Sequence, residues 1–206
     1  MHLAIELHHG DLPDGLDFGN VVAVDTETMG LKPFSDRLCV AQLSAGDGIC
    51  HLVQFEVGGY SAPNLKRILG DTNVLKLFHF ARFDIAVLRR YLDVTCTPLY
   101  CTKIASKLAR SYTDRHGLKD LCRELLGVEL SKQQQSSDWG GPTLSEAQLN
   151  YAASDVLHLH ALREKLDVML LREGRDKTAQ AAFEFLPARA ALDLMGWEQT
   201  DIFAHS

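Results

Sequence analysis

The chain has 206 residues, of which 46% are hydrophobic and 23% are charged, and its five cysteines show no C-x-x-C spacing. These values favour one soluble globular domain with reduced thiols in the cytoplasm, and no apolar run approaches the ~18 residues of a membrane span. The formal net charge of −6 disfavours a long nucleic acid bound through many phosphates but allows a small anion in a local pocket.

The first quarter of the chain has the pattern of a small sheet. A strand is predicted over 3–8, at a sheet edge, followed by a turn and by a short apolar run that predicts a buried strand over 21–27. Two further strands are predicted over 37–43 and 49–55, joined by the Gly-Asp-Gly turn 46–48. Three consecutive strands with short connections predict an antiparallel meander.

The remainder is predicted to be mostly helical. A helix is expected over 61–69, a strand over 74–78 and a helix over 81–91. Gly127 has the position of a helix C-cap, and Ser145 to Gln148 form a capping box. The pattern therefore predicts a mixed α/β domain. The other predicted helices cover 102–110, 117–127, 144–172 and 176–195.

Two carboxylates follow the apolar residues of the predicted strand 21–27. Asp25 and Glu27 alternate with Thr26, so both carboxylates point to one face and the threonine points to the other. Two carboxylates on one face of a core strand repel each other and need a cation or a proton. Taken alone, the same pair is also compatible with a strand end in solvent.

Three further residues continue this pattern. Asp84 lies in the first turn of the helix predicted after strand 74–78, and Tyr151 and Asp155 share one face of the predicted helix 144–172. Each is ordinary by itself, because a helix-start Asp and a surface Asp beside a core Tyr are common. Their order along the chain is unusual: Asp25-x-Glu27 comes first, then Asp84, then Tyr151-x-x-x-Asp155.

This order resembles the three exonuclease motifs of the DEDD superfamily, and the tyrosine resembles its DEDDy branch, which includes ribonuclease D and the proofreading domains of DNA polymerases. The resemblance implies a ribonuclease H-like DnaQ/DEDD exonuclease fold, with a mixed sheet of antiparallel and parallel strands flanked by helices. It covers roughly residues 20–172. The ribonuclease D-like segments are Cys101 to Ala105, Asp138-Trp139 and Leu144 to Val156.

In length and in three further segments, the chain looks specifically like the bacterial nanoRNase C group. These segments are 113–117, 132–139 and the tail 201–206. The resemblance implies a single exonuclease domain over 1–206, with a catalytic core of about 20–172 and a C-terminal helical segment of about 174–206. It also implies a homo-octamer that degrades very short RNAs, dinucleotides above all.

The resemblance further implies a chemistry for the acidic residues. Asp25, Glu27, Asp84 and Asp155 would hold two divalent cations, Mg²⁺ or Mn²⁺, with Asp25 bridging them. Glu27 and Asp155 would complete the site of the attacking water, and Asp84 would hold the second ion. Tyr151 would orient the nucleophile or help to deprotonate it. The product of this 3′–5′ exoribonuclease would be a 5′-monophosphate.

Substrate contacts leave alternatives open. Leu31 would be an apolar wedge between two bases, or else a loop residue folded into the core. A basic cluster would hold a terminal 5′-phosphate, or else form a solvated stripe. Trp139 would stack on a base or be packed. The apolar residues of 176–206 would form an interface or pack on the chain's own core. The basic cluster comprises Lys103, Lys107 and Arg110 at helical spacing, followed by Arg115 and His116.

Three functions compete at this point. The first is a metal-dependent 3′–5′ exoribonuclease for oligoribonucleotides of a few residues, and the second is a general ribonuclease D that trims RNA 3′ ends. The acidic charge and the absence of room for C-terminal helical domains argue against the second. The third is a catalytically silent nucleic-acid-binding or assembly protein on the same fold, and the full set of four carboxylates and a tyrosine argues against it.

Overall fold

The computed structural model describes residues 4–131, 134 and 137–205. Part of the nanoRNase C-like segment 132–139 therefore lies outside the described residues, as does the first residue of the predicted strand 3–8. The elements are β1 (Ala4–His9), β2 (Val21–Thr28), β3 (Leu38–Ser44), β4 (Ile49–Gln54), α1 (Pro63–Gly70), β5 (Leu75–Phe78), α2 (Ala81–Leu92), β6 (Leu99–Cys101), α3 (Thr102–Ala109), α4 (Leu118–Leu121), α5 (Glu146–Leu157), α6 (Leu159–Arg172) and α7 (Asp176–Leu192).

The described strands form one mixed sheet in the order β1-β4-β3-β2-β5-β6. The predicted meander is confirmed, because β2 pairs antiparallel with β3, and β3 antiparallel with β4. The β1–β4, β2–β5 and β5–β6 pairs are parallel. Strand β1 stands first in the strand order, so it is an edge strand, as predicted. The mixed sheet flanked by helices confirms the predicted fold class.

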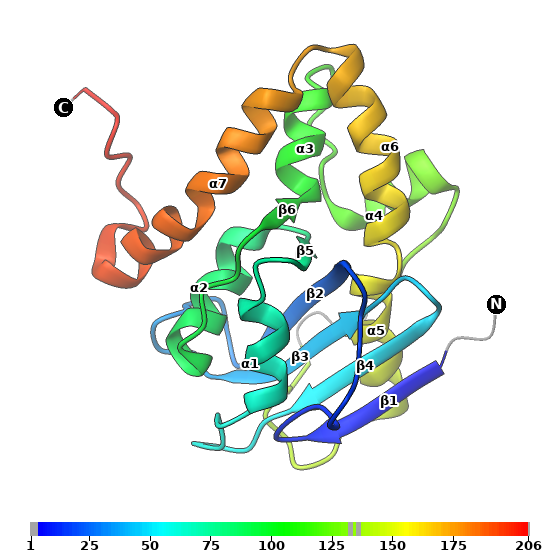
Figure 1. Cartoon of the computed structure of the whole chain (residues 1–206), viewed down its shortest axis with the longest axis vertical. Helices are drawn as coiled ribbons and strands as arrows, with labels where there is room; N and C mark the ends of the chain where they lie inside the picture. The colour runs from blue at the N-terminus through cyan, green and yellow to red at the C-terminus, as the bar shows by residue number, and fades with distance from the viewer. Residues whose placement is uncertain (1–3, 132–133, 135–136, 206) are drawn as a thin grey trace.

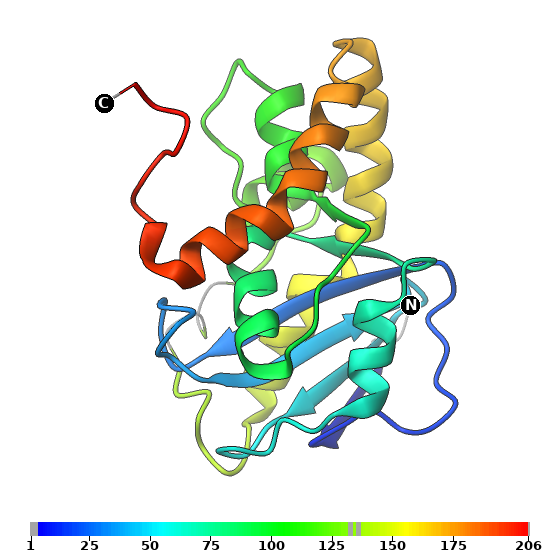
Figure 2. The same cartoon turned by 60° about the vertical axis from the view of Figure 1, so that its left-hand side comes forward.

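Helices cover both faces of the sheet. Helices α1 and α2 lie on one face, and α5 lies on the other against β2, β3 and β4 (Figure 1; Figure 2). Every residue of β3 is buried, as expected for a central strand covered on both faces. Helix α6 packs on α3, while α7 crosses α2 and β6, so these helices extend the molecule beyond the sheet (Figure 1).

Helix boundaries differ from the prediction at one important point. The helix predicted over 144–172 is two helices, because the backbone leaves regular helical geometry at His158, with φ −103° and ψ −4°. The break lets α5 lie on the sheet while α6 turns to pack on α3. Periodicity did not reveal it, since both halves keep an apolar side. The capping box is confirmed: Ser145 N donates to Gln148 Oε1 at 2.9 Å.

Two other differences are smaller. Strand β6 was not predicted, because Leu99 to Cys101 is too short to show a period of two. The predicted helix 117–127 is α4 followed by the π-helical turn Cys122–Leu126, and Gly127 ends it with φ 70°. All five cysteines are free and buried. No helix in the described part of the chain combines the length and apolar character that crossing a membrane requires.

Candidate active site

The carboxyl end of β2 carries the first two acidic residues. Asp25 and Glu27 are half-buried and point to the same face, as strand alternation predicts. Thr26 points to the other face, where its hydroxyl donates a 2.7 Å hydrogen bond to Oδ1 of Asp84. This bond fixes Asp84, which is 2% exposed in the first turn of α2. One strand thus presents two carboxylates directly and orients a third.

Helix α5 supplies the remaining two residues. Because α5 packs across β2, β3 and β4, one face of its third turn meets the end of β2. The carboxylate oxygens of Asp155, Asp25 and Glu27 lie within 4.8 Å of one another. The phenol of Tyr151, one turn earlier, lies near the Asp155 carboxylate and lowers the pKa of that carboxyl, against the larger opposite effect of burial. The structure therefore brings together all five residues predicted from the motifs.

The electrostatics of this cluster are strongly perturbed. Burial, with the charges of its acidic neighbours, raises the pKa of Asp25 well above its usual range. Burial together with Asp155 and Asp84 raises the pKa of Glu27 to about 9. Burial likewise raises the pKa values of Asp84 and Asp155 to about 7. Burial next to these carboxylates also raises the pKa of Tyr151. The protein alone does not neutralise this concentration of negative charge.

A divalent cation fits this donor set. All four carboxylates offer hard oxygen ligands, and three of them have oxygens close enough to share an ion. Asp84 stands slightly apart, but its charge still raises the pKa values of Asp25 and Glu27. The raised pKa values show that the ionised carboxylates lack compensating charge, which Mg²⁺ or Mn²⁺ would supply.

These acidic residues line a cleft of about 720 Å³. The sequence allowed Leu31 to be either a wedge between two bases or a loop residue folded into the core. In the structure Leu31 is 87% exposed at the rim of this cleft. Sequence reasoning missed other lining residues, since they come from loops and helix starts that carry no motif. Those with long side chains are Met29, Phe80, Phe83 and Lys119, whereas Lys103, which also lines the cleft, belongs to the basic cluster predicted from the sequence. The ammonium of Lys103 lies 4.4 Å from the centre of the Phe80 ring.

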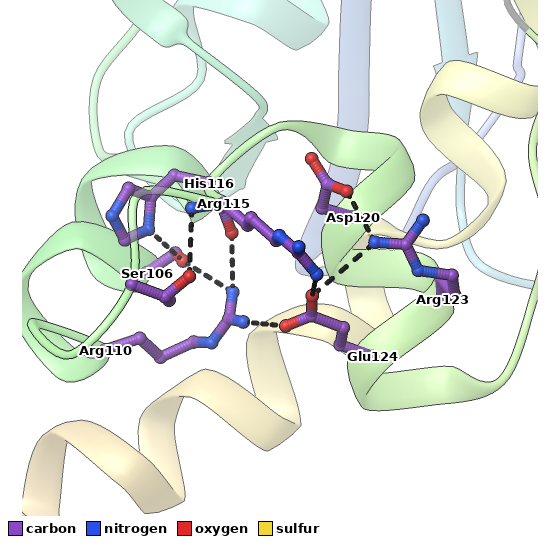
Figure 3. A network of polar contacts seen from close by, with 8 residues as sticks. Ser106, Arg110, Arg115, His116, Asp120, Arg123 and Glu124 are labelled. Carbon is purple, nitrogen blue, oxygen red and sulfur yellow. Dashed lines mark hydrogen bonds and ion pairs between the residues drawn. The ribbon is translucent and has the colours of Figure 1, made fainter.

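The predicted phosphate-binding cluster has a different environment. Arg110 is 1% exposed, and its guanidinium pairs with Glu124 and donates to the Arg115 carbonyl oxygen at 2.9 Å (Figure 3). His116 shares a 2.9 Å hydrogen bond with the Ser106 hydroxyl. Neither these residues nor the exposed Lys107 and Arg115 line the cleft. In this structure Arg110 and His116 hold the loop that precedes α4, rather than presenting free donors.

Two further side chains for which the sequence suggested possible roles, Trp139 and His79, have structural roles in the fold. Trp139 is 2% exposed, and its ring is tilted against that of Tyr151 at 6.0 Å between centroids. It supports the tyrosine instead of offering a free face to a base. His79, predicted to be structural, shares a 2.9 Å hydrogen bond with the Thr102 hydroxyl, and burial lowers its pKa to about 3.

Carboxylates that line one cleft at the end of a central strand, and can share a divalent cation, are the arrangement of metal-dependent hydrolases, nucleases among them. Residues 11–171 match the model of a 3′–5′ exonuclease family. The chain belongs to this 3′–5′ exonuclease family, and the resemblance to its members that the motifs predicted is confirmed.

Two relatives, one of them in two solved structures, define the similarity further. The NrnC protein of Brucella melitensis bound to pGG is 55% identical, with a TM-score of 0.96 and full coverage of both chains. The same protein with bound Mg²⁺ is 54% identical, with a TM-score of 0.95 and coverage of 98% of this chain and 100% of that one. Ribonuclease D of Acidiphilium cryptum is 34% identical over 154 residues, which are 75% of this chain and 39% of the relative. The chain thus spans about two fifths of that curated relative.

Proposed function

We propose that this chain is a two-metal-ion 3′–5′ exoribonuclease that hydrolyses very short RNA oligonucleotides, dinucleotides preferred, to 5′-monophosphates. The observation that carries this proposal is the convergence of Asp25, Glu27, Asp84 and Asp155 in one cleft. Carboxylates with such raised pKa values are rarely tolerated without a function. The buried cysteines are compatible with a cytoplasmic enzyme.

Each residue has a role that follows from its position. Asp25, Glu27 and Asp155 would hold one cation through their neighbouring oxygens, and Asp84, oriented by Thr26, would help to hold a second. Two bound divalent cations stabilise the charge on the attacking and leaving oxygens of a phosphodiester. Tyr151, which lies near Asp155 and packs against Trp139, would orient the attacking water with its hydroxyl.

Substrate selection follows from the walls of the cleft. Leu31 is exposed at the rim and would contact the two terminal bases. Lys103 and Lys119 are the lysines that line the described cleft, and they would attract a terminal 5′-phosphate, with Lys107 and Arg115 in the surrounding field. The NrnC relative is bound to pGG, which supports a short oligonucleotide as the ligand of this cleft.

A labelled ladder of two to ten nucleotides in Mn²⁺ tests the substrate length. We expect 5′-phosphorylated dinucleotides to be cleaved faster than heptamers. A charge-assisted contact to phosphate contributes about 1.5–3 kcal/mol, so removing the 5′-phosphate should weaken binding by about tenfold or more. The Lys119→Ala variant should lose most of this preference, whereas Lys165→Ala, on the exposed face of α6, should retain it.

Equal rates across the ladder, with or without the 5′-phosphate, would favour a general ribonuclease D activity instead. Since the ladder includes longer RNAs, that outcome would preserve the exonuclease assignment and refute only the dinucleotide preference. Absence of hydrolysis at any length, with Mn²⁺ binding shown independently, would favour the catalytically silent protein.

The C-terminal region supports assembly as a homo-oligomer, and we infer an octamer as in the resembling group. Phe183 and Leu186 on α7 pack into the core, but other apolar side chains from Phe185 onward remain exposed. We therefore expect multi-angle light scattering at micromolar concentration to give several times the 22.9 kDa chain mass. A monomer mass would contradict this inference. The exposed residues are Phe185, Met195, Trp197, Ile202 and Phe203.

A further inference from the structure

Three potential metal ligands converge outside the cleft, where the edge strand β1 pairs with β4 (Figure 1). Glu6 and His8 are two residues apart on β1, so their side chains share one face of the sheet. His51 on β4 is the Cα partner of Glu6 in the parallel register, and its side chain projects on the same side. Two neighbouring strands thus place one carboxylate and two imidazoles together.

The distances between the ligand atoms are short. His8 Nε2 lies 3.1 Å from His51 Nδ1, and His51 Nδ1 lies 3.4 Å from Oε2 of Glu6. The third separation, from His8 Nε2 to Glu6 Oε2, is 4.0 Å. Without a cation the contact between the two imidazoles is a hydrogen bond, and all three atoms lie close enough together to serve as ligands of one ion.

These separations correspond to the ligand shell of a small dication. Zn–N bonds of ~2.0–2.1 Å and Zn–O bonds of ~2.0–2.2 Å put neighbouring ligand atoms roughly 3.3–3.5 Å apart in a tetrahedral site. Two of the three separations lie within a few tenths of an ångström of this range. The longest involves Glu6, whose side chain is 52% exposed and can turn toward the imidazoles at little cost.

The surroundings hold the imidazoles ready to bind. The His8 and His51 rings are stacked, with 14° between their planes, and the edge of Phe18 packs against His51. Their side chains are only 15% and 8% exposed, respectively, and burial lowers the pKa values of both residues. Histidine binds metals as the neutral imidazole, and burial favours this form. Glu6 brings the negative charge that completes a two-histidine, one-carboxylate set.

We propose that Glu6, His8 and His51 form a second metal site, which binds a transition-metal dication such as Zn²⁺ and fastens the edge strand β1 to β4. Imidazole ligands suit Zn²⁺, whereas the all-carboxylate cleft suits Mg²⁺ or Mn²⁺, so the two sites differ in chemistry. Three protein ligands leave a fourth position for water. Within the described sheet β1 pairs only with β4, so a metal link across this pair would protect an edge that otherwise frays.

The test uses the full-length chain carrying Asp25→Asn and Asp155→Asn, so that the cleft contributes little to Zn²⁺ binding. Calorimetric titration with Zn²⁺ should give one site per chain. Adding His8→Gln should lower its affinity by about tenfold or more, since loss of even an outer-shell partner costs 10–100-fold. The matched control is His9→Gln, which removes the neighbouring exposed imidazole on the opposite face of β1 and should leave binding unchanged.

Hydrogen exchange provides a second readout. Zn²⁺ should slow exchange of the β1 amides in the parent and in His9→Gln, but not in His8→Gln. Glu6→Gln alters an exposed side chain and repeats the test without a buried substitution, with the same expected loss of affinity. Equal Zn²⁺ affinities for His8→Gln and His9→Gln, or Zn²⁺ binding that leaves β1 exchange unchanged, would overturn the proposal.

Discussion

Replacing Asp25 by Asn should abolish hydrolysis while leaving the fold intact. Asp25 lies at the centre of the carboxylate cluster, and the neutral amide cannot bridge two cations as a carboxylate does. Metal stabilisation of the transition state is worth several kcal/mol, so we expect a loss on the order of 10³-fold or more in kcat/KM on a labelled dinucleotide. Asp155→Asn should have a similar effect.

The melting temperature of the metal-free variant separates catalysis from folding. Asp25 is repelled by the neighbouring carboxylates, so its neutral replacement should leave the melting temperature unchanged or higher. Asp176→Asn, at the exposed start of α7, is the matched control and should retain full activity. An active Asp25→Asn protein would refute the two-metal assignment, whereas an inactive one that unfolds early would indicate a structural role.

Stability of the metal-free protein should fall as the pH rises from about 5 to 9. The folded state raises the pKa of Glu27 from 4.5 to about 9, and those of Asp84 and Asp155 from 3.8 to about 7. Between the unfolded and folded pKa values, the native state binds more protons than the unfolded chain does. The bound protons therefore make their full contribution to the free energy of unfolding at low pH. This contribution is lost as the pH rises through the pKa values of the folded state. Thermal melts across this range measure the slope.

Mn²⁺ should oppose this loss, because bound cations neutralise the ionised carboxylates. At a concentration about 100 times Kd, binding stabilises the native state by about 2.7 kcal/mol, roughly 5–10 °C in melting temperature for a chain of this size. The gain should be larger at pH 8 than at pH 5. The control is the Asp25→Asn, Asp155→Asn double variant, which should show a shallower pH slope and little response to Mn²⁺. If stability fell equally steeply with pH in both proteins, the titrating groups would lie outside the carboxylate cluster.

The residues of the cleft were predicted from the sequence in two different ways. Local patterns predicted the β2 strand, the pairing of Asp25 with Glu27 on one face, and Asp84 at a helix start. These features depend on strand alternation and helix-end electrostatics, which act over a few residues. The motif order then linked Tyr151 and Asp155 to them, because a resemblance over the whole chain carries information that periodicity lacks.

The basic cluster shows where local reasoning stopped. Helical spacing placed Lys107 and Arg110 on one face of the predicted helix 102–110. It did not reveal that α3 ends at Ala109, or that Glu124, beyond the following loop, pairs with the Arg110 guanidinium (Figure 3). Likewise, Lys119 lines the cleft from α4, just after the loop whose Arg115 carbonyl oxygen accepts a hydrogen bond from Arg110. Partners distant in sequence decided which cations remain available for a substrate.

The sequence by itself determined the sheet meander, the capping box of α5 and the identity of the five cleft residues, since each is encoded by local pattern or by motif. Only the tertiary structure revealed the break between α5 and α6 at His158 and the burial of Trp139. It also revealed that Glu6 and His8 on β1 lie next to His51 on β4. The physical reason is the same in each case. Packing and strand register join segments far apart in the chain, and the free energy of those contacts outweighs the local preferences that a sequence displays.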